Sequence, residues 1–136
     1  MDLYAETILD HYRHPHGKRV LKNPTITHSE KNLSCGDALS LSLVIEKNII
    51  TEIGWSGEGC AISQAAMSML SETVWGKTPE EIDALSKDSI FSLLKVPISA
   101  RRMKCALLGL HTLKNAIRAW QEKPMQTWAG TMEHMQ

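Results

Sequence analysis

The chain has 136 residues, of which 43% are hydrophobic and 22% are charged. This composition is typical of a folded globular protein, and the length suits one domain, which we expect over residues 1–122 with a tail over 123–136. Basic and acidic residues number 15 each, so no overall charge favours nucleic acid or an anionic membrane. No apolar run is long enough to span a membrane and no secretory leader is visible, so we expect a cytoplasmic protein.

The first half of the chain shows one helical pattern and then strand patterns. Apolar residues at helical spacing predict a helix over residues 3–13. Residues 18–34 predict an irregular segment with a short edge strand around 25–28. Leucine and serine alternate over residues 38–46, and residues 49–55 are also good strand formers. The two stretches predict an antiparallel hairpin.

The second half predicts helices. A helix should run from Cys60 to Trp75, and a short one should begin after Thr78 with Pro79 in its first turn. Asp88 is the expected cap of a second short helix. A long helix should begin near Cys105 and end at about residue 121, and the tail should be frayed or a short packed segment. These elements predict an α+β fold, with an antiparallel sheet of about three strands and helices on one face.

The three cysteines are the main chemical signal. An odd number cannot all pair within one chain, and a reducing cytosol disfavours disulfides, so metal binding or thiol chemistry becomes plausible. The alternative is three unrelated buried thiols, because free cysteine packs well as a small apolar residue.

Two of the cysteine motifs have local features that suit metal ligands. In Cys35-Gly36-Asp37 the glycine allows a tight turn, so a thiolate and a carboxylate can face one ion. Cys60 follows a glycine-rich stretch and stands at the start of a predicted helix, where the helix dipole favours thiolate over thiol.

Cys105 has a similar setting. It also stands near a helix start, and Arg101, Arg102 and Lys104 beside it would stabilise negative charge. If the three cysteines and Asp37 converge, they offer three sulfurs and one oxygen, a set that suits tetrahedral zinc or an iron–sulfur cluster. Their spacing is not that of a zinc finger, so the residues alone leave convergence open.

Four segments together resemble the U-type iron–sulfur cluster assembly proteins, which comprise SufU, IscU and the N-terminal part of NifU. They are YAETILDHYR at 4–13, SCGD at 34–37, GEGCAIS at 57–63 and RMKCA at 102–106. Lys104 stands where IscU proteins have a histidine, which makes the chain similar to SufU. The stretch between Cys60 and Cys105 is short, as in IscU, and lacks the insertion usual in SufU.

The resemblance implies a SufE/IscU-like fold and a function in iron–sulfur cluster assembly. It implies that Cys35, Asp37, Cys60 and Cys105 bind either Zn²⁺ or a transient [2Fe–2S] cluster. A pyridoxal-phosphate cysteine desulfurase of the SufS type would donate persulfide sulfur, first to Cys35 or else to Cys105, and apo iron–sulfur proteins would be the acceptors. Arg101, Arg102 and Lys104 would serve desulfurase docking or charge balance.

Several functions fit these residues. The protein can build a cluster, or it can be a zinc-dependent sulfurtransferase that only shuttles sulfur, or a purely structural zinc domain. A thiol enzyme would need a histidine base, and no histidine lies near a cysteine in the sequence, so a scaffold or sulfur acceptor is favoured over an enzyme. We expect His111 to be structural, Trp128 and Met132 to make loose apolar contacts, and the histidines at 11, 14 and 16 to be solvated or to contact a partner.

Overall fold

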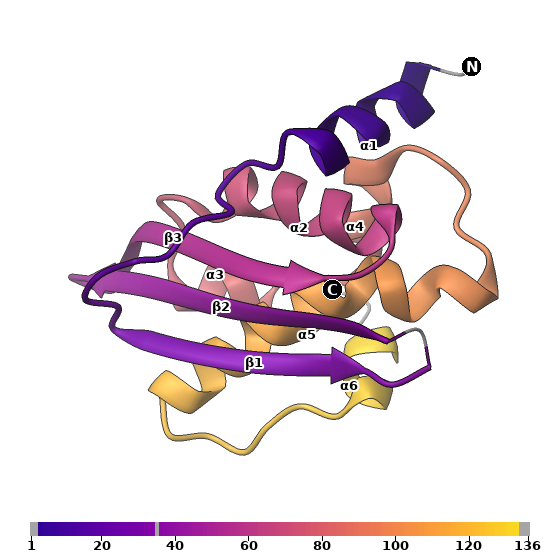
Figure 1. The fold of residues 1–136 in the computed structure, drawn as a ribbon. Helices are drawn as coiled ribbons and strands as arrows, with labels where there is room; N and C mark the ends of the chain where they lie inside the picture. The colour runs from indigo at the N-terminus through magenta and orange to yellow at the C-terminus, as the bar shows by residue number, and fades with distance from the viewer. Residues whose placement is uncertain (1–2, 35, 134–136) are drawn as a thin grey trace.

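The structure is a computed structural model that describes residues 3–34 and 36–133. A three-stranded sheet and a set of helices make up the fold (Figure 1). The helices are α1 (Leu3–Arg13), α2 (Ala61–Val74), α3 (Pro79–Asp83), α4 (Lys87–Leu94), α5 (Met103–Trp120) and α6 (Trp128–Glu133), with a 3₁₀ turn, η1 (Ala100–Arg102), before α5. The strands are β1 (Ile26–Asn32), β2 (Asp37–Glu46) and β3 (Ile49–Glu58).

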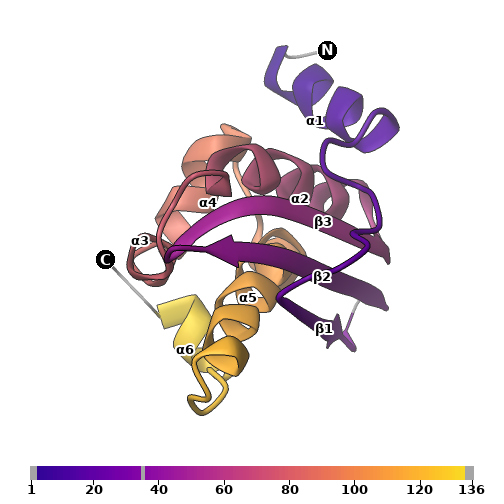
Figure 2. The same ribbon diagram turned by 90° about the vertical axis from the view of Figure 1, so that its left-hand side faces the viewer.

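The sheet is antiparallel throughout, in the order β1-β2-β3. Lys47 and Asn48 join β2 to β3 with φ angles of 52° and 61°, the left-handed conformation that two-residue hairpin turns use because it follows the twist of the strands. That twist is visible when the sheet is turned by 90° (Figure 2). The hairpin expected over residues 38–55 is therefore confirmed, and each strand is slightly longer than the pattern indicated.

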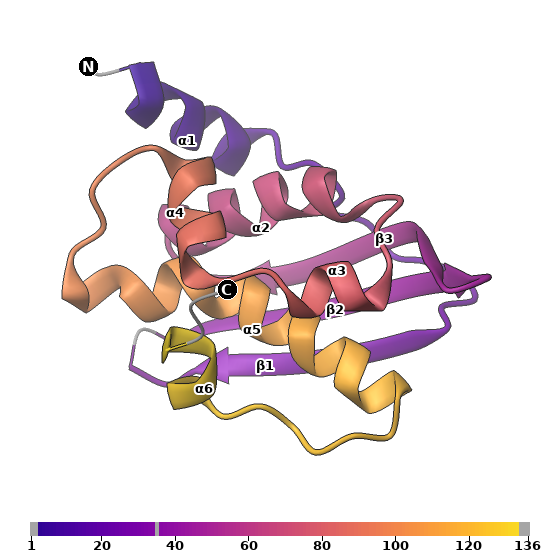
Figure 3. The ribbon, with the colours of Figure 1, turned by 180° about the vertical axis from the view of Figure 1, so that it is seen from behind.

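The helices cover one face of the sheet. Alternate residues of β2 point to that face, and Leu39, Leu41 and Leu43 are fully or almost fully buried there. Viewed from behind, α5 crosses the sheet with α2 beside it, and α1 lies outside α2 (Figure 3). The α+β fold with helices on one face is thus as expected. Asp37 is two residues before Leu39, so its side chain lies on the same face of β2 as the buried leucines. Its carboxylate therefore also points to the helical side.

Two local predictions were wrong. The edge strand runs over Ile26–Asn32 rather than 25–28. Its backbone pairing with β2 continues to Asn32 and Asp37, and this pairing holds the strand although its residues are mostly polar. The helix α4 is capped by Ser86 and not by Asp88, which lies in its first turn. The Ser86 backbone N–H donates to Ser89 Oγ at 3.1 Å, as in a capping box.

The C-terminal segment forms α6, which packs on α5. Trp128 and Met132 lie against the hydrophobic core, and the ring of Trp128 stacks on that of His111 with centroids 4.1 Å apart. Asn115 holds the preceding loop, since it accepts from the Gln126 backbone N–H at 2.7 Å and donates to its carbonyl at 3.1 Å. Of the two alternatives for the tail, the packed segment is the one observed as far as Glu133.

None of the helices in the described ranges combines the length and the apolar character that crossing a membrane requires.

Candidate metal centre

Asp37 begins β2, directly after a tight turn. The turn depends on Gly36, whose φ of 72° favours glycine and whose N–H donates to the Asn32 carbonyl at 2.9 Å. Asp37 pairs with Asn32 across the two strands, and its side chain is 2% exposed. A carboxylate this deeply buried needs hydrogen bonds or a cation to offset its desolvation.

Cys60 stands at the N-cap position of α2. Its extended backbone, with φ −72° and ψ 166°, turns the chain from β3 into the helix. The Cys60 N–H donates to Asp37 Oδ1 at 3.0 Å, and Ser63 Oγ donates to the Cys60 carbonyl at 3.1 Å. These bonds hold the cysteine against the carboxylate, with the thiol half-buried at the positive end of the helix.

Cys105 lies in the first turn of α5 and is completely buried. Asn32 Nδ2 lies 3.9 Å from its sulfur, within the range of a weak N–H···S hydrogen bond. Asn32 therefore touches the site from β1 although nothing in the sequence identified it. The only hint was its place three residues before Cys35.

The folded chain brings Asp37, Cys60 and Cys105 together. Their ligand atoms all lie within 4.8 Å of one another. Asp37 Oδ1 is occupied by Cys60, whereas Asp37 Oδ2 is buried without a hydrogen-bond partner in the described part of the chain. An orphaned carboxylate oxygen beside two cysteine sulfurs fits a metal ion with thiolate and carboxylate ligands, because such an ion would satisfy the oxygen.

The other predicted site residues are less fully placed. Cys35 lies outside the described residues, so its predicted roles as ligand and sulfur acceptor stay predictions. Arg101 and Arg102 are exposed on η1. Lys104 is half-buried, with its Nζ 5.8 Å from the centre of the Trp128 ring. The basic residues thus lie on η1 and in the first turn of α5, next to Cys105 in the chain.

Thr131 and Glu30 engage the side chain of His111. Its Nδ1 is 2.7 Å from Thr131 Oγ1 and its Nε2 is 3.6 Å from Glu30 Oε1. Burial lowers the pKa of His111, an effect that Glu30 opposes and His28 reinforces. Both ring nitrogens are engaged, which agrees with a structural histidine and leaves it unsuited to act as a general base for Cys105.

A comparison with protein families identifies the family of this chain. Residues 3–127 match the sequence model of the NifU-like N terminal domain. The chain belongs to the NifU-like N-terminal domain family. This NifU-like domain includes β1, β2, β3 and the starts of α2 and α5, and therefore all the residues of the candidate centre.

Individual relatives of this NifU-like chain are known under two names. The zinc-dependent sulfurtransferase SufU of Bacillus subtilis is 40% identical over 90 residues, which cover 66% of this chain and 59% of that protein. The iron–sulfur cluster assembly scaffold protein IscU of Thermotoga maritima is 29% identical over 132 residues, which cover 85% of this chain and 93% of that protein. This chain thus spans less than two thirds of the Bacillus protein.

A solved structure confirms the fold. The N-terminal domain of a NifU-like protein from Brucella abortus superposes with a TM-score of 0.74 at 21% identity, covering 90% of this chain and 96% of that domain. The expected α+β fold is therefore confirmed, and the sequence model over residues 3–127 confirms the family resemblance.

Proposed function

We propose that this protein acts in iron–sulfur cluster assembly, by accepting persulfide sulfur from a cysteine desulfurase, by holding a nascent cluster, or by both. The observation that carries this proposal is the convergence of Asp37, Cys60 and Cys105 from three separate elements. Asp37 Oδ2 supports it, because this oxygen is buried without a hydrogen-bond partner among the described residues, and a bound cation would offset its desolvation.

Cys35 is the proposed fourth ligand. It stands two residues before Asp37 in the sequence, and a cysteine–glycine–aspartate stretch can present a thiolate and a carboxylate to one ion. Three thiolates and one carboxylate around a divalent ion carry a net negative charge. Arg101, Arg102 and Lys104 can balance this charge or contact an acidic surface of the desulfurase.

The proposed sulfur transfer is a thiol–disulfide type exchange. The thiolate of Cys35, or alternatively of Cys105, attacks the outer sulfur of the desulfurase persulfide. A new S–S bond forms on this protein while the S–S bond of the desulfurase breaks, and the desulfurase cysteine leaves as a thiolate. The exchange needs no external oxidant or reductant. Complete burial argues against Cys105 as the first acceptor, because attack requires access, so Cys35 is our first choice.

Two forms of the function share the same ligands. In the scaffold form, iron and sulfide are the cargo, and the carboxylate of Asp37 is a harder and weaker ligand than thiolate, which favours release of the cluster. In the alternative form the protein is a zinc-dependent sulfurtransferase that only shuttles sulfur. Zinc at the same residues would keep the thiols deprotonated until they are needed.

The proposed partners follow from this chemistry. A pyridoxal-phosphate desulfurase of the SufS type would supply sulfur, and apo iron–sulfur proteins would receive the product. The cytoplasm is the proposed compartment, because a reducing environment keeps the three thiols free for ligation.

Anaerobic purification followed by two assays tests the proposal. Near-stoichiometric zinc with stimulation of the cognate desulfurase would support the sulfurtransferase, and a reconstituted cluster that moves to an apo-ferredoxin would support the scaffold. Cys35→Ser and Cys105→Ser then identify the acceptor. Only the substitution that removes the acceptor cysteine should abolish persulfide labelling of this protein. A chain that neither stimulates a desulfurase nor transfers a cluster would overturn both forms.

A further inference from the structure

A second group of metal-ligand side chains lies at the other end of α2. The ligand atoms of His11, His16 and Glu72 are all within 4.8 Å of one another. Glu72 is near the C-terminus of α2 and Cys60 is at its N-terminus, so at 1.5 Å per residue the two sites are about 18 Å apart along the helix. This group is therefore independent of the candidate metal centre.

The distances suit a small cation. Glu72 Oε1 lies 3.0 Å from His16 Nδ1 and 3.6 Å from His11 Nε2. In a tetrahedral zinc site with bonds of about 2.0–2.1 Å, neighbouring nitrogen and oxygen ligands are roughly 3.3 Å apart. The distances from Glu72 to the two histidines are therefore close to that spacing.

The backbone of His16 is held in place by the core. Its N–H donates to Ser68 Oγ at 2.8 Å, and its carbonyl accepts from the indole N–H of Trp55 at 2.8 Å. Both Ser68 and Trp55 are buried. The backbone of His16 is thus fixed against α2, although His16 belongs to the loop after α1. Only the His16 side chain can still rotate.

Ser68 also orients His11. Its hydroxyl oxygen lies 2.7 Å from His11 Nδ1, which leaves Nε2 directed at Glu72. Metal-binding histidines almost always use one ring nitrogen for the metal and the other for such a hydrogen bond, which fixes the tautomer and the ring. One buried serine therefore supports both histidines.

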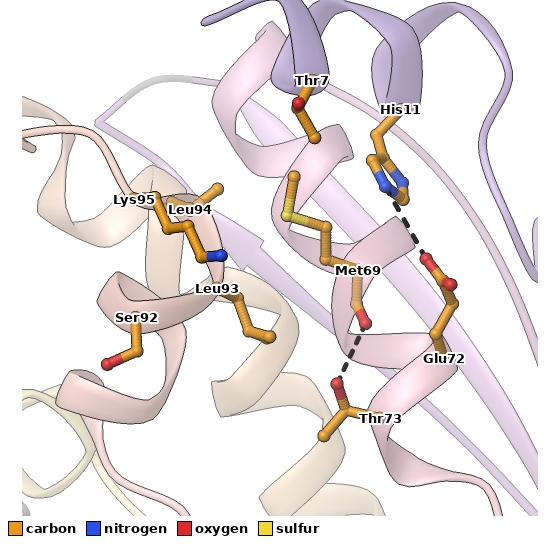
Figure 4. A pocket seen from close by; sticks show the side chains of 9 residues that line it. All are labelled: Thr7, His11, Met69, Glu72, Thr73, Ser92, Leu93, Leu94 and Lys95. Atoms are coloured by element: carbon orange, nitrogen blue, oxygen red, sulfur yellow. Dashed lines mark hydrogen bonds and ion pairs between the residues drawn. The ribbon is translucent and has the colours of Figure 1, made fainter. Parts of the chain in front are cut away.

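The group is open to solvent on one side. The side chain of His11 is 13% exposed, whereas those of His16 and Glu72 are each 52% exposed. Figure 4 shows His11 on α1 and Glu72 on α2 facing each other at the edge of a groove that is also lined by Met69 and Lys95. A metal ion held here would keep a coordination position for water or an incoming ligand.

We propose that His11, His16 and Glu72 form a second metal site, which takes zinc or a similar divalent first-row transition metal. Imidazole nitrogen with one carboxylate oxygen is a donor set that such ions prefer. One carboxylate faces two imidazole rings whose centroids are 4.8 Å apart, an arrangement that a single bound cation would satisfy. The bound ion joins α1 and its following loop to α2.

Zinc titration of the full chain, followed by native mass spectrometry, tests the proposal. We expect His16→Ala and Glu72→Gln to lose one zinc ion per chain, and Ser68→Ala to weaken that ion about 10- to 100-fold. His14→Ala is the matched control, since His14 is an exposed histidine of the same segment that is not part of the group. It should keep the zinc content of the unaltered protein. Equal zinc content in His16→Ala and in the unaltered protein would overturn the proposal.

Nitrogen-15 spectra of the histidine rings give a second and independent measurement. Added zinc should shift the Nε2 signal of His11 and the Nδ1 signal of His16, and should leave His14 unchanged. The same shifts should persist in Cys60→Ser, which alters only the proposed cluster site, so failure of that site would not affect this result. If the two ring signals stay unchanged at saturating zinc, the second site does not exist.

Discussion

The backbone N–H of Cys60 donates to Asp37 Oδ1 at 3.0 Å, while the other oxygen of that carboxylate is buried and has no hydrogen-bond partner in the described residues. One side chain therefore does two things. It fixes the start of α2, and it can offer an oxygen to an ion that the nearby sulfurs of Cys60 and Cys105 also bind.

Asp37→Ala removes both roles, and Asp37→Asn removes mainly the charge. We expect each variant to weaken zinc binding at least about 100-fold, because a lost ligand costs at least as much as a lost outer hydrogen bond. The alanine variant should also be destabilised by about 1–3 kcal/mol because the Cys60 N–H loses its acceptor. Competition with a zinc chelator and urea unfolding measure the two effects. If zinc affinity and cluster lability are both unchanged, the proposed ligand set is wrong.

Gly59→Ala tests how tightly the centre is packed. A Cβ at this position would overlap Asp37 Oδ1 and Ser63 Oγ, both of which belong to the hydrogen-bonded start of α2. We expect a loss of stability of about 1–3 kcal/mol from overpacking together with weaker metal binding, measured by denaturant unfolding and by chelator competition.

Gly76→Ala is the matched control for this prediction. Its φ of 84° strains any larger residue, but a Cβ there meets no atom within 4 Å in the described structure. It should lose about 1–2 kcal/mol of stability and bind metal as the unaltered protein does. Full metal affinity in Gly59→Ala would show that Gly59 does not shape the site.

His111 should make the stability of the fold depend on pH. Its pKa is lowered by burial, so the folded state disfavours its protonation. The stability that neutral His111 contributes is therefore complete above the ordinary pKa of about 6.5 and is lost as the pH falls from there through the lower folded-state pKa.

Unfolding in urea between pH 5 and pH 8 measures this effect. His111→Gln should flatten the fall in unfolding free energy on the acid side. An acid-side slope that is the same in His111→Gln and in the unaltered protein would contradict the prediction.

Asn115 anchors the segment that leads to α6. Its side chain is 1% exposed, and it makes two hydrogen bonds to the backbone of Gln126 and one to Glu30. Asn115→Ala should cost about 1–3 kcal/mol, because these backbone groups lose their partner. Proteolysis should become faster between residues 121 and 128. Asn23→Ala, in the exposed loop before β1, should change stability by less than about 0.5 kcal/mol, and equal proteolysis of the two variants would refute the role of Asn115.

Local patterns were sufficient for most of the fold. The leucine–serine alternation of β2 and the Thr78-Pro79 start of α3 depend on neighbours within a few residues, so the sequence predicted them. The polar strand β1 was predicted too short because an edge strand gains its hydrogen bonds from β2, whatever its own hydrophobicity. The cap of α4 was assigned to Asp88 instead of Ser86, since several nearby residues can cap a helix and packing selects one.

The sequence was sufficient for the family and for the residue types of the candidate centre, because motifs such as SCGD and GEGCAIS are short contiguous stretches that can be recognised without a structure. Only the tertiary structure could show that Asp37, Cys60 and Cys105 meet, since no local rule relates residues on three different elements. The same holds for Glu72, which gives His11 and His16 a common partner from another helix. Long-range packing decides which side chains share one small volume, and that packing depends on the whole core at once.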